Sequence, residues 1–214
     1  MKQYFKIKEQ NKDSILFFRL GDFYEMFYDD AKIASKELEL TLTGRDCGQA
    51  ERAPMCGVPF HSCEGYIARL VAKGYKVAIC EQTEDPATAK GLVKRDIIRV
   101  ITPGTVMESS MLDEGRNNYI CCMFSDSNKI GLCFCDISTG ELYATEISGS
   151  DSVNSLTSQL ASYNPREILI GGDIVKIKSL PAFIKSKLSA GVEMLRDESF
   201  DNKLCTDTVN MQFG

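Results

Sequence analysis

The residues with the clearest chemical potential are Phe23 and Glu25, two positions apart in the segment Gly21–Phe27. They follow the apolar run Ile15–Phe18, which predicts a buried strand, and they open a segment with apolar residues at helical spacing. We therefore expect them at a strand-to-helix corner. An aromatic ring can wedge between nucleic-acid bases, and a carboxylate can hydrogen-bond a base edge. The pair suits a duplex whose stacking and pairing are locally lost.

The same residues also have a structural interpretation that needs no ligand. Asp22 is a suitable N-cap residue, and Glu25 follows it at the spacing of a capping box, in which the acid bonds back to the N-cap amide. Apolar residues at positions 23, 27, 31, 34 and 38 repeat with a period near 3.6, which predicts an amphipathic helix from Phe23 to about Leu38. In this interpretation Phe23 begins the buried stripe of the helix.

A longer match favours the first interpretation. The segment Gly21–Ala31 reads GDFYEMFYDDA and resembles the signature of the MutS family of DNA mismatch-recognition proteins, whose mismatch-reading element is Phe-x-Glu. Further blocks that resemble this family are Pro54–His61, Val77–Gly91 and Arg99–Thr105. The resemblance covers nearly the whole chain and is strongest over residues 15–105. It implies that Phe23 enters from the minor groove and stacks on a mispaired or unpaired base, which Glu25 hydrogen-bonds.

The resemblance also implies contacts with the DNA backbone or groove, for which we select Arg45, Met55 and Arg95. The densest basic cluster of the chain consists of Lys90, Lys94, Arg95 and Arg99. On charge alone such a cluster is typical of a solvated face. Phosphate contacts position a protein without reading sequence, which suits a protein that must bind any sequence context. The single histidine, His61, is assigned a structural role, because a lone histidine makes neither a metal site nor a catalytic triad.

The elements that must position these residues are predicted from hydrophobic periodicity and turn residues. In the first half we expect helices at 2–12, 23–38 and 62–73, strands at 15–20, 75–80 and 97–102, a loop at 43–53, an irregular apolar stretch at 54–59, and a turn or short helix at 86–90. In the second half we expect strands at 119–124, 130–137, 141–147 and 167–170, a helix at 153–163, and a helical segment at 174–188 broken near Pro181.

The predicted fold class is α/β, in two domains. Residues 1–105 form a small mixed-sheet domain, which by resemblance is the mismatch-recognition domain, and residues 106–118 form a polar linker. Residues 119–214 show three antiparallel strands, then a helix, then a strand, an order that resembles the RNase H-like fold of the MutS connector domain. The sequence stops in the middle of this pattern. We therefore expect an N-terminal part of a longer protein, with the connector domain truncated.

The charge is unevenly distributed along the chain. The 214 residues carry a formal net charge of −5, which argues against a free-standing nucleic-acid-binding domain. Residues 1–105 hold 16 Lys/Arg and 15 Asp/Glu, whereas residues 106–214 hold 9 and 15. DNA binding therefore belongs to the first half, and its nearly balanced charge predicts weak affinity for DNA on its own.

Several functional classes find no support in the sequence. There is no P-loop pattern and no G-x-S-x-G motif, so we expect no enzyme activity and no cofactor in this chain. The nine cysteines lack zinc-ligand spacing, and we expect reduced thiols and no metal. Neither an export signal nor an apolar run of 18 residues is present, which predicts a cytoplasmic protein without a membrane span.

The resemblance implies further partners, and two alternatives stay open. MutS proteins carry a downstream ATPase that uses ATP and Mg²⁺, form dimers around the duplex, and recruit MutL through the connector region. One alternative is a pure protein-interaction module whose acidic second half binds a repair partner. The other is an RNase H-like nuclease with carboxylates around two metal ions, for which the nearest candidates are Asp126, Asp136 and Glu141.

Overall fold

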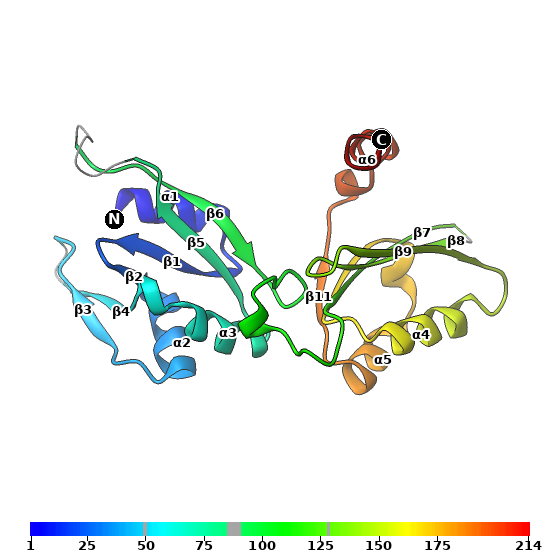
Figure 1. Cartoon of the computed structure of the whole chain (residues 1–214), viewed down its shortest axis with the longest axis horizontal. Coiled ribbons are helices and arrows are strands. Elements are labelled where there is room, and N and C mark those ends of the chain that lie inside the picture. The colour runs from blue at the N-terminus through cyan, green and yellow to red at the C-terminus, as the bar shows by residue number, and fades with distance from the viewer. Residues whose placement is uncertain (49–50, 85–90, 128) are drawn as a thin grey trace. The chain divides into compact units, whose positions relative to one another are not determined.

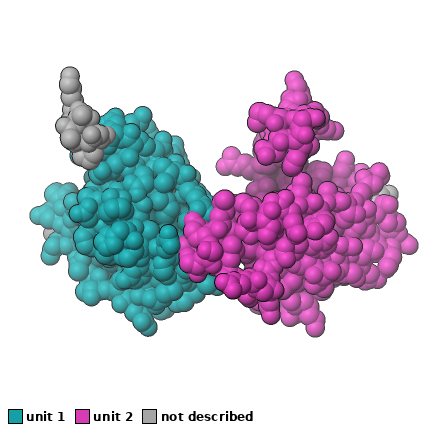
Figure 2. Space-filling model, in the orientation of Figure 1, with its two compact units in different colours: residues 1–103 teal, residues 104–214 magenta. Residues whose placement is uncertain are grey.

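The computed structural model describes residues 1–48, 51–84, 91–127 and 129–214. The chain forms two compact units, Met1–Pro103 and Gly104–Gly214, which are coloured separately in Figure 2. Each unit contains one mixed sheet with helices packed against it, so the α/β class predicted from the sequence is confirmed. In the described part of the chain, no helix combines the length and the apolar character that a bilayer span requires.

The first unit is built on a six-stranded sheet in the order β3-β4-β2-β1-β5-β6. Its strands are β1 (Ser14–Leu20), β2 (Phe23–Phe27), β3 (Thr43–Arg45), β4 (Ala53–Pro59), β5 (Lys76–Gln82) and β6 (Arg95–Ile101). Only β1 and β5 pair in parallel, and every other neighbouring pair is antiparallel. Strand β2 therefore lies inside the sheet, hydrogen-bonded to β1 on one edge and to β4 on the other.

Helices cover both faces of this sheet (Figure 1). They are α1 (Lys2–Gln10), α2 (Tyr28–Leu38) and α3 (Glu64–Ala72), with a 3-10 turn η1 (Phe60–Ser62) before α3. Helix α1 places Tyr4 and Ile7 in a core cluster with Leu16, Phe18 and Phe27 on one face of the sheet. Helices α2 and α3 contact the sheet through β4, β2 and β5.

The prediction of a helix from Phe23 is wrong. Residues Phe23–Phe27 form strand β2, and helix α2 begins only at Tyr28. The predicted stripe is real from position 27 onward, because Phe27, Ala31, Ala34 and Leu38 are all buried. Phe23 lies outside it with 47% of its surface exposed. Since the residue at the N-cap of α2 is Phe27, the capping-box interpretation of Asp22 and Glu25 is wrong as well.

Two further stretches are more regular than predicted. The predicted loop at 43–53 contains strand β3, and the apolar stretch at 54–59 belongs to β4, whose two prolines are its second and its last residue. Tight pairing with β2 makes this stretch a strand although proline cannot donate to a ladder. The helices predicted at 2–12 and 62–73 and the strands at 15–20, 75–80 and 97–102 are confirmed with shifted ends. The turn predicted at 86–90, including Lys90, lies outside the described residues.

The second unit has a five-stranded sheet in the order β11-β10-β7-β8-β9. Its strands are β7 (Tyr119–Asp126), β8 (Lys129–Asp136), β9 (Glu141–Ser148), β10 (Glu167–Gly172) and β11 (Gly191–Met194). Strand β8 is antiparallel to both of its neighbours, β7 and β9, and β10 runs parallel to β7 and β11. This is the RNase H-like order predicted from the sequence, with β11 as an edge strand that the prediction missed.

Helices α4 (Ser152–Tyr163) and α5 (Leu180–Lys187) complete the core of this unit with Leu156, Leu160 and Ile184. The predicted break near Pro181 is present, as the 3-10 turn η3 (Asp173–Lys176) precedes α5. The remaining short elements are the 3-10 turns η2 (Ser109–Met111) and η4 (Asp197–Phe200) and the helix α6 (Asn202–Phe213), which was not predicted. Phe200 of η4 stacks on Phe124 of β7 with ring centroids 4.7 Å apart.

The nine cysteines form no disulfide. Cys56, Cys80 and Cys121 are buried, and burial raises the pKa of the Cys56 thiol to about 11 and that of Cys80 to about 12. Such thiols stay protonated at neutral pH and pack as small hydrophobes, as the sequence predicts.

The first prediction concerns Asp30, a buried acid that links three elements of the first unit. Its carboxylate accepts 2.9 Å from Lys8 Nζ of α1 and 3.0 Å from the Leu16 amide of β1. We expect Asp30→Ala to lower the free energy of unfolding by about 1–3 kcal/mol, because it leaves the Leu16 amide buried without an acceptor. Urea unfolding followed by circular dichroism measures this. The control is Asp29→Ala, whose exposed pair with Lys32 contributes little; an equal loss there would contradict the assignment.

Candidate nucleic-acid interface

Phe23 lies at the end of a tight hairpin. Strands β1 and β2 are joined by only Gly21 and Asp22, and Gly21 adopts a φ of +57°, which glycine tolerates without strain. Phe23 is the first residue of β2 and pairs with Leu20. The Phe60 amide donates 3.0 Å to the Asp22 carbonyl and ties the turn to the segment after β4. A large apolar ring is therefore held half exposed at the tip of a rigid element.

Glu25 lies two residues farther along β2, so its side chain projects from the same face of the sheet as Phe23. Its cross-strand neighbours are Phe18 on β1 and Gly57 on β4. A Cβ at Gly57 would lie 3.2 Å from the Tyr24 carbonyl oxygen and 3.5 Å from Glu25 Cγ. The absence of a side chain at Gly57 thus leaves the space beside the Glu25 carboxylate open.

Arg45 uses that open space. It lies on β3, and its guanidinium Nη1 donates to Glu25 Oε2 in an ion pair. The Arg45 guanidinium carbon also lies 6.0 Å from the centre of the Phe27 ring, so the arginine extends across the sheet face toward β2. The Arg45 side chain is 43% accessible and that of Glu25 is 17% accessible. The pair is therefore open to solvent on the Arg45 side.

Met55 lies on the same face of the sheet. It is opposite Phe27 of β2 and Thr43 of β3, and it packs against the core cluster beneath α1. The structure thus brings together four of the five residues selected from the sequence, namely Phe23, Glu25, Arg45 and Met55.

Arg95 is not part of this group. It lies on β6, at the opposite edge of the sheet from β3. Its guanidinium donates to the Arg19 carbonyl at 2.7 Å, the Val93 carbonyl at 2.8 Å and Gln3 Oε1 at 3.1 Å, and it lies over the ring of Phe18. Burial lowers its pKa. Arg95 therefore connects β6 to α1 and β1, a role that the basic pattern of the sequence does not reveal.

Sequence reasoning also missed a cluster on the opposite face of the hairpin. The Arg19 guanidinium lies 3.4 Å from the centre of the Phe60 ring and donates 3.1 Å to Glu81 Oε1, which also accepts from the Tyr24 hydroxyl. Burial is the main cause of the raised pKa of Tyr24, followed by the Glu81 carboxylate. These contacts stabilise the hairpin on the face opposite Phe23 and Glu25. Strand alternation through Arg19 and Tyr24 would have indicated them, had β2 been predicted as a strand.

Comparison with known proteins decides the family. The family model for MutS domain I matches residues 1–110, and the model for MutS domain II matches residues 118–214. The chain belongs to the MutS family. This assignment agrees with the GDFYEMFYDDA segment, which contains both Phe23 and Glu25.

Relatives over the whole chain carry the name DNA mismatch repair protein MutS. The protein from Acetivibrio thermocellus is 52% identical over 213 residues, and that from Desulforamulus reducens is 51% identical over 216 residues; both alignments cover all of this chain. The protein from Ruminiclostridium cellulolyticum is 55% identical over 201 residues, or 94% of this chain. These alignments cover 24%, 25% and 23% of the three relatives, so the chain spans about a quarter of their length.

The carboxylates considered for a nuclease site lie in the region that matches MutS domain II, and they are not clustered. Asp126 ends β7, whereas Asp136 pairs with Tyr119 at the start of β7, about 23 Å away along the strand at a rise of about 3.3 Å per residue. Glu141 lies opposite Asp136 but accepts from Asn117 and Tyr119. Within the described ranges, no group of three His, Cys, Asp or Glu side chains is placed to hold a metal ion. The geometry therefore does not form a two-metal site.

Asp136 has a structural role instead. It is 1% exposed, and its carboxylate accepts from the amides of Asn118 and Ser138 and from the Ser138 hydroxyl, at 2.9, 2.9 and 2.6 Å. Burial acts to raise its pKa, but these hydrogen bonds to the charged form prevail and lower it. The carboxylate anchors the start of β7 to the turn after β8.

The lowered pKa gives a prediction for the dependence of stability on pH. A depressed pKa contributes stability that is present above the unfolded value of about 3.9 and is lost as the pH falls through the folded value. We expect Asp136→Asn to be less stable than wild type at pH 7 and the difference to shrink below about pH 4. Thermal unfolding at pH 7 and pH 3 measures this. The exposed Asp126→Asn serves as the control, and a difference for Asp136→Asn that does not vary with pH would contradict the assignment.

Proposed function

We propose that this chain reads mispaired or unpaired bases in duplex DNA, with Phe23 as the wedge and Glu25 as the hydrogen-bonding partner of the displaced base. The observation that carries the proposal is the half-exposed ring of Phe23 at a hairpin tip, with a carboxylate on the same strand face. Successive same-face residues of a strand are about 6.7 Å apart. A base stacked on Phe23 therefore lies with its edge within reach of Glu25.

The selectivity in this proposal comes from the DNA. A mispaired or unpaired step costs less to unstack and kink than a paired one, so the wedge enters there first. Stacking of a base on an aromatic ring contributes about 1–3 kcal/mol. That is enough to bias recognition, but it is not enough to hold a duplex, and the nearly balanced charge of residues 1–105 adds little phosphate attraction.

Arg45 completes the proposed site. By pairing with Oε2 of Glu25 it orients the carboxylate and cancels a negative charge that would face the phosphates. Oε1 is then the oxygen that accepts from a ring N–H of the base, whereas a base that presents an acceptor requires a protonated Glu25. A guanidinium has five N–H donors, so Arg45 can hold Glu25 and also contact the DNA. Met55 lines the same face beside it.

ATP use, dimer formation and binding of a MutL-like protein are expected of a longer protein that contains this chain. We propose that this chain acts within a cytoplasmic MutS protein in which a homodimer encircles DNA, ATP and Mg²⁺ act at residues outside this chain, and a MutL-like protein binds through the second unit. The family assignment supports this proposal, as does the share of each relative that the chain covers. In this proposal, protein interaction is a function of the second unit, and DNA reading is a function of the first.

The proposal predicts the effect of removing the wedge. In the complete MutS protein, Phe23→Ala should abolish the preference for a G·T or single-base-loop duplex over the matched homoduplex, because the ring that stacks on the displaced base is gone. Fluorescence anisotropy at fixed salt measures both affinities. Phe5→Ala is the matched control, because Phe5 is also 47% exposed but lies on α1. Retained discrimination in the Phe23 variant would show that the wedge assignment is wrong.

A further prediction concerns Glu25. Glu25→Ala removes an acid from the DNA-facing surface, so homoduplex binding should stay the same or become stronger. Arg45→Ala should reduce mismatch preference in the wild-type background and have little further effect on that preference in the Glu25→Ala background, because Arg45 influences base reading through its pair with Glu25. A double-mutant cycle on the two affinities measures this coupling. Strictly additive effects would mean that the two residues act independently.

A further inference from the structure

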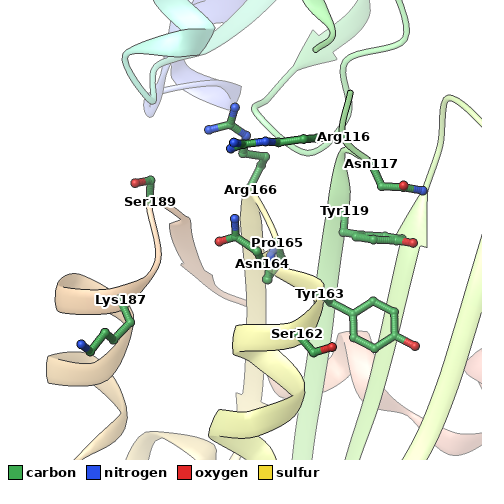
Figure 3. A pocket seen from close by; sticks show the side chains of 10 residues that line it. All are labelled: Arg116, Asn117, Tyr119, Ser162, Tyr163, Asn164, Pro165, Arg166, Lys187 and Ser189. Carbon is green, nitrogen blue, oxygen red and sulfur yellow. The ribbon is translucent and has the colours of Figure 1, made fainter. Parts of the chain in front are cut away.

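The second unit contains a cavity of about 390 Å³ at the edge of the sheet where β7 and β10 begin (Figure 3). Helices α4 and α5 end beside it. Three cations from separate segments line it: Arg116 precedes β7, Arg166 precedes β10, and Lys187 is the last residue of α5. We call it the basic cavity and define it by these three residues. Figure 3 shows the side chains of Arg116 and Arg166 at the upper end of the cavity and Lys187 on the neighbouring helix.

The charge of the basic cavity is uncompensated. None of the residues that line it is an acid. Among the described residues, Arg116 is paired only with Asp113, at 3.9 Å, and both side chains are more than half exposed, so that pair contributes little. Within the same part of the chain, Arg166 and Lys187 have no side-chain ion pair. Residues 106–214 hold only 9 Lys/Arg against 15 Asp/Glu, and three of those nine line this cavity.

A second cavity of the same unit provides the comparison. It has a volume of about 720 Å³ and is lined by two lysines, Lys129 and Lys176. Both are paired with acids: Lys129 lies 2.8 Å from Glu146, and Lys176 lies 2.7 Å from Asp173. Both lysines of this second cavity are therefore neutralised by acids of the same unit. The basic cavity differs because, within the described residues, neither Arg166 nor Lys187 forms an ion pair with an acid.

We propose that the basic cavity binds a phosphoryl group. A carboxylate carries one charge and two oxygens in a plane, whereas a phosphoryl group carries up to two charges and presents oxygens in several directions. The two arginines reach the cavity from separate segments and Lys187 adds a third positive charge to its lining, and arginine in particular donates in pairs to phosphate. The side chains of Ser162, Asn164 and Ser189 add neutral donors around the same space. The proposal is independent of mismatch reading, because it concerns only residues of the second unit.

The position of Lys187 can also be explained without a ligand, and the test must distinguish that explanation from phosphoryl binding. A lysine in the last turn of a helix interacts favourably with the helix dipole, and α5 ends at Lys187. That role would lower stability when Lys187 is replaced and would leave ligand binding unchanged. Arg166 is not part of a helix, so it is the better residue to substitute. It is also exposed, so its replacement by glutamine should leave the fold intact.

The experiment uses the chain of residues 1–214 and isothermal titration calorimetry at low salt, with pyrophosphate as the probe. Saturable binding that weakens about tenfold in Arg166→Gln, a change of about 1.4 kcal/mol, supports the proposal, because the substitution removes a charge-assisted hydrogen bond to the anion. The matched control is Lys176→Gln at the second cavity, which should bind as wild type does. Circular dichroism confirms that each variant is folded.

Further titrations distinguish the source of the phosphoryl group. If a short homoduplex displaces pyrophosphate and its own binding depends on Arg166, the cavity holds a backbone phosphate of DNA. If the homoduplex does not displace it, the ligand class is a small phosphorylated molecule. Absence of saturable pyrophosphate binding would overturn the proposal, as would an equal loss in Lys176→Gln. Binding of an acidic peptide without pyrophosphate binding would overturn it in favour of a protein partner.

Discussion

Strand β2 is hydrogen-bonded along both edges, to β1 and to β4, and this double pairing holds Phe23 and Glu25 in position. Residues on a strand alternate between faces, so the pairing fixes which side chains project together. The Phe60 amide anchors the hairpin turn, and the cluster of Arg19, Phe60 and Glu81 supports it from the other face. A wedge on a regular element is held more closely than one on a loop. The other parts of the first unit support this strand.

Electrostatics sets the second constraint on the interface. A carboxylate that faces DNA is repelled by phosphates, and its pairing with Arg45 offsets that repulsion. The pair can form because the intervening strand has glycine at position 57, so no side chain separates the arginine from the acid. The basic residue at the opposite edge, Arg95, is committed to contacts within the unit. The proposed interface is thus suited to reading a base rather than to binding the backbone.

The sequence predicts most of the elements but not the one that matters most for the site. Apolar runs such as Ile15–Phe18 gave correct strands, and the buried stripe of α2 was correct from Phe27 onward. The helical period extended by chance to Phe23, and five residues are too few for periodicity to separate strand from helix. Pairing with β1 and with the distant β4 makes this segment a strand, and the two prolines of β4 concealed the second partner. The ion pair of Glu25 with Arg45 depends on the same long-range register and was not predictable either.

The two units differ in how charge is arranged, and this separates their roles. Exposed cations cost little free energy when unpaired, so a single lone lysine in the second unit would indicate nothing. The lining of one cavity by Arg116, Arg166 and Lys187 is different, because no acid lines that cavity beside them. These cations attract an anion that enters the cavity, whereas the net acidic charge of residues 106–214, with 9 Lys/Arg against 15 Asp/Glu, disfavours a long stretch of DNA backbone. A compact phosphoryl ligand satisfies both conditions, and an extended one satisfies only the first.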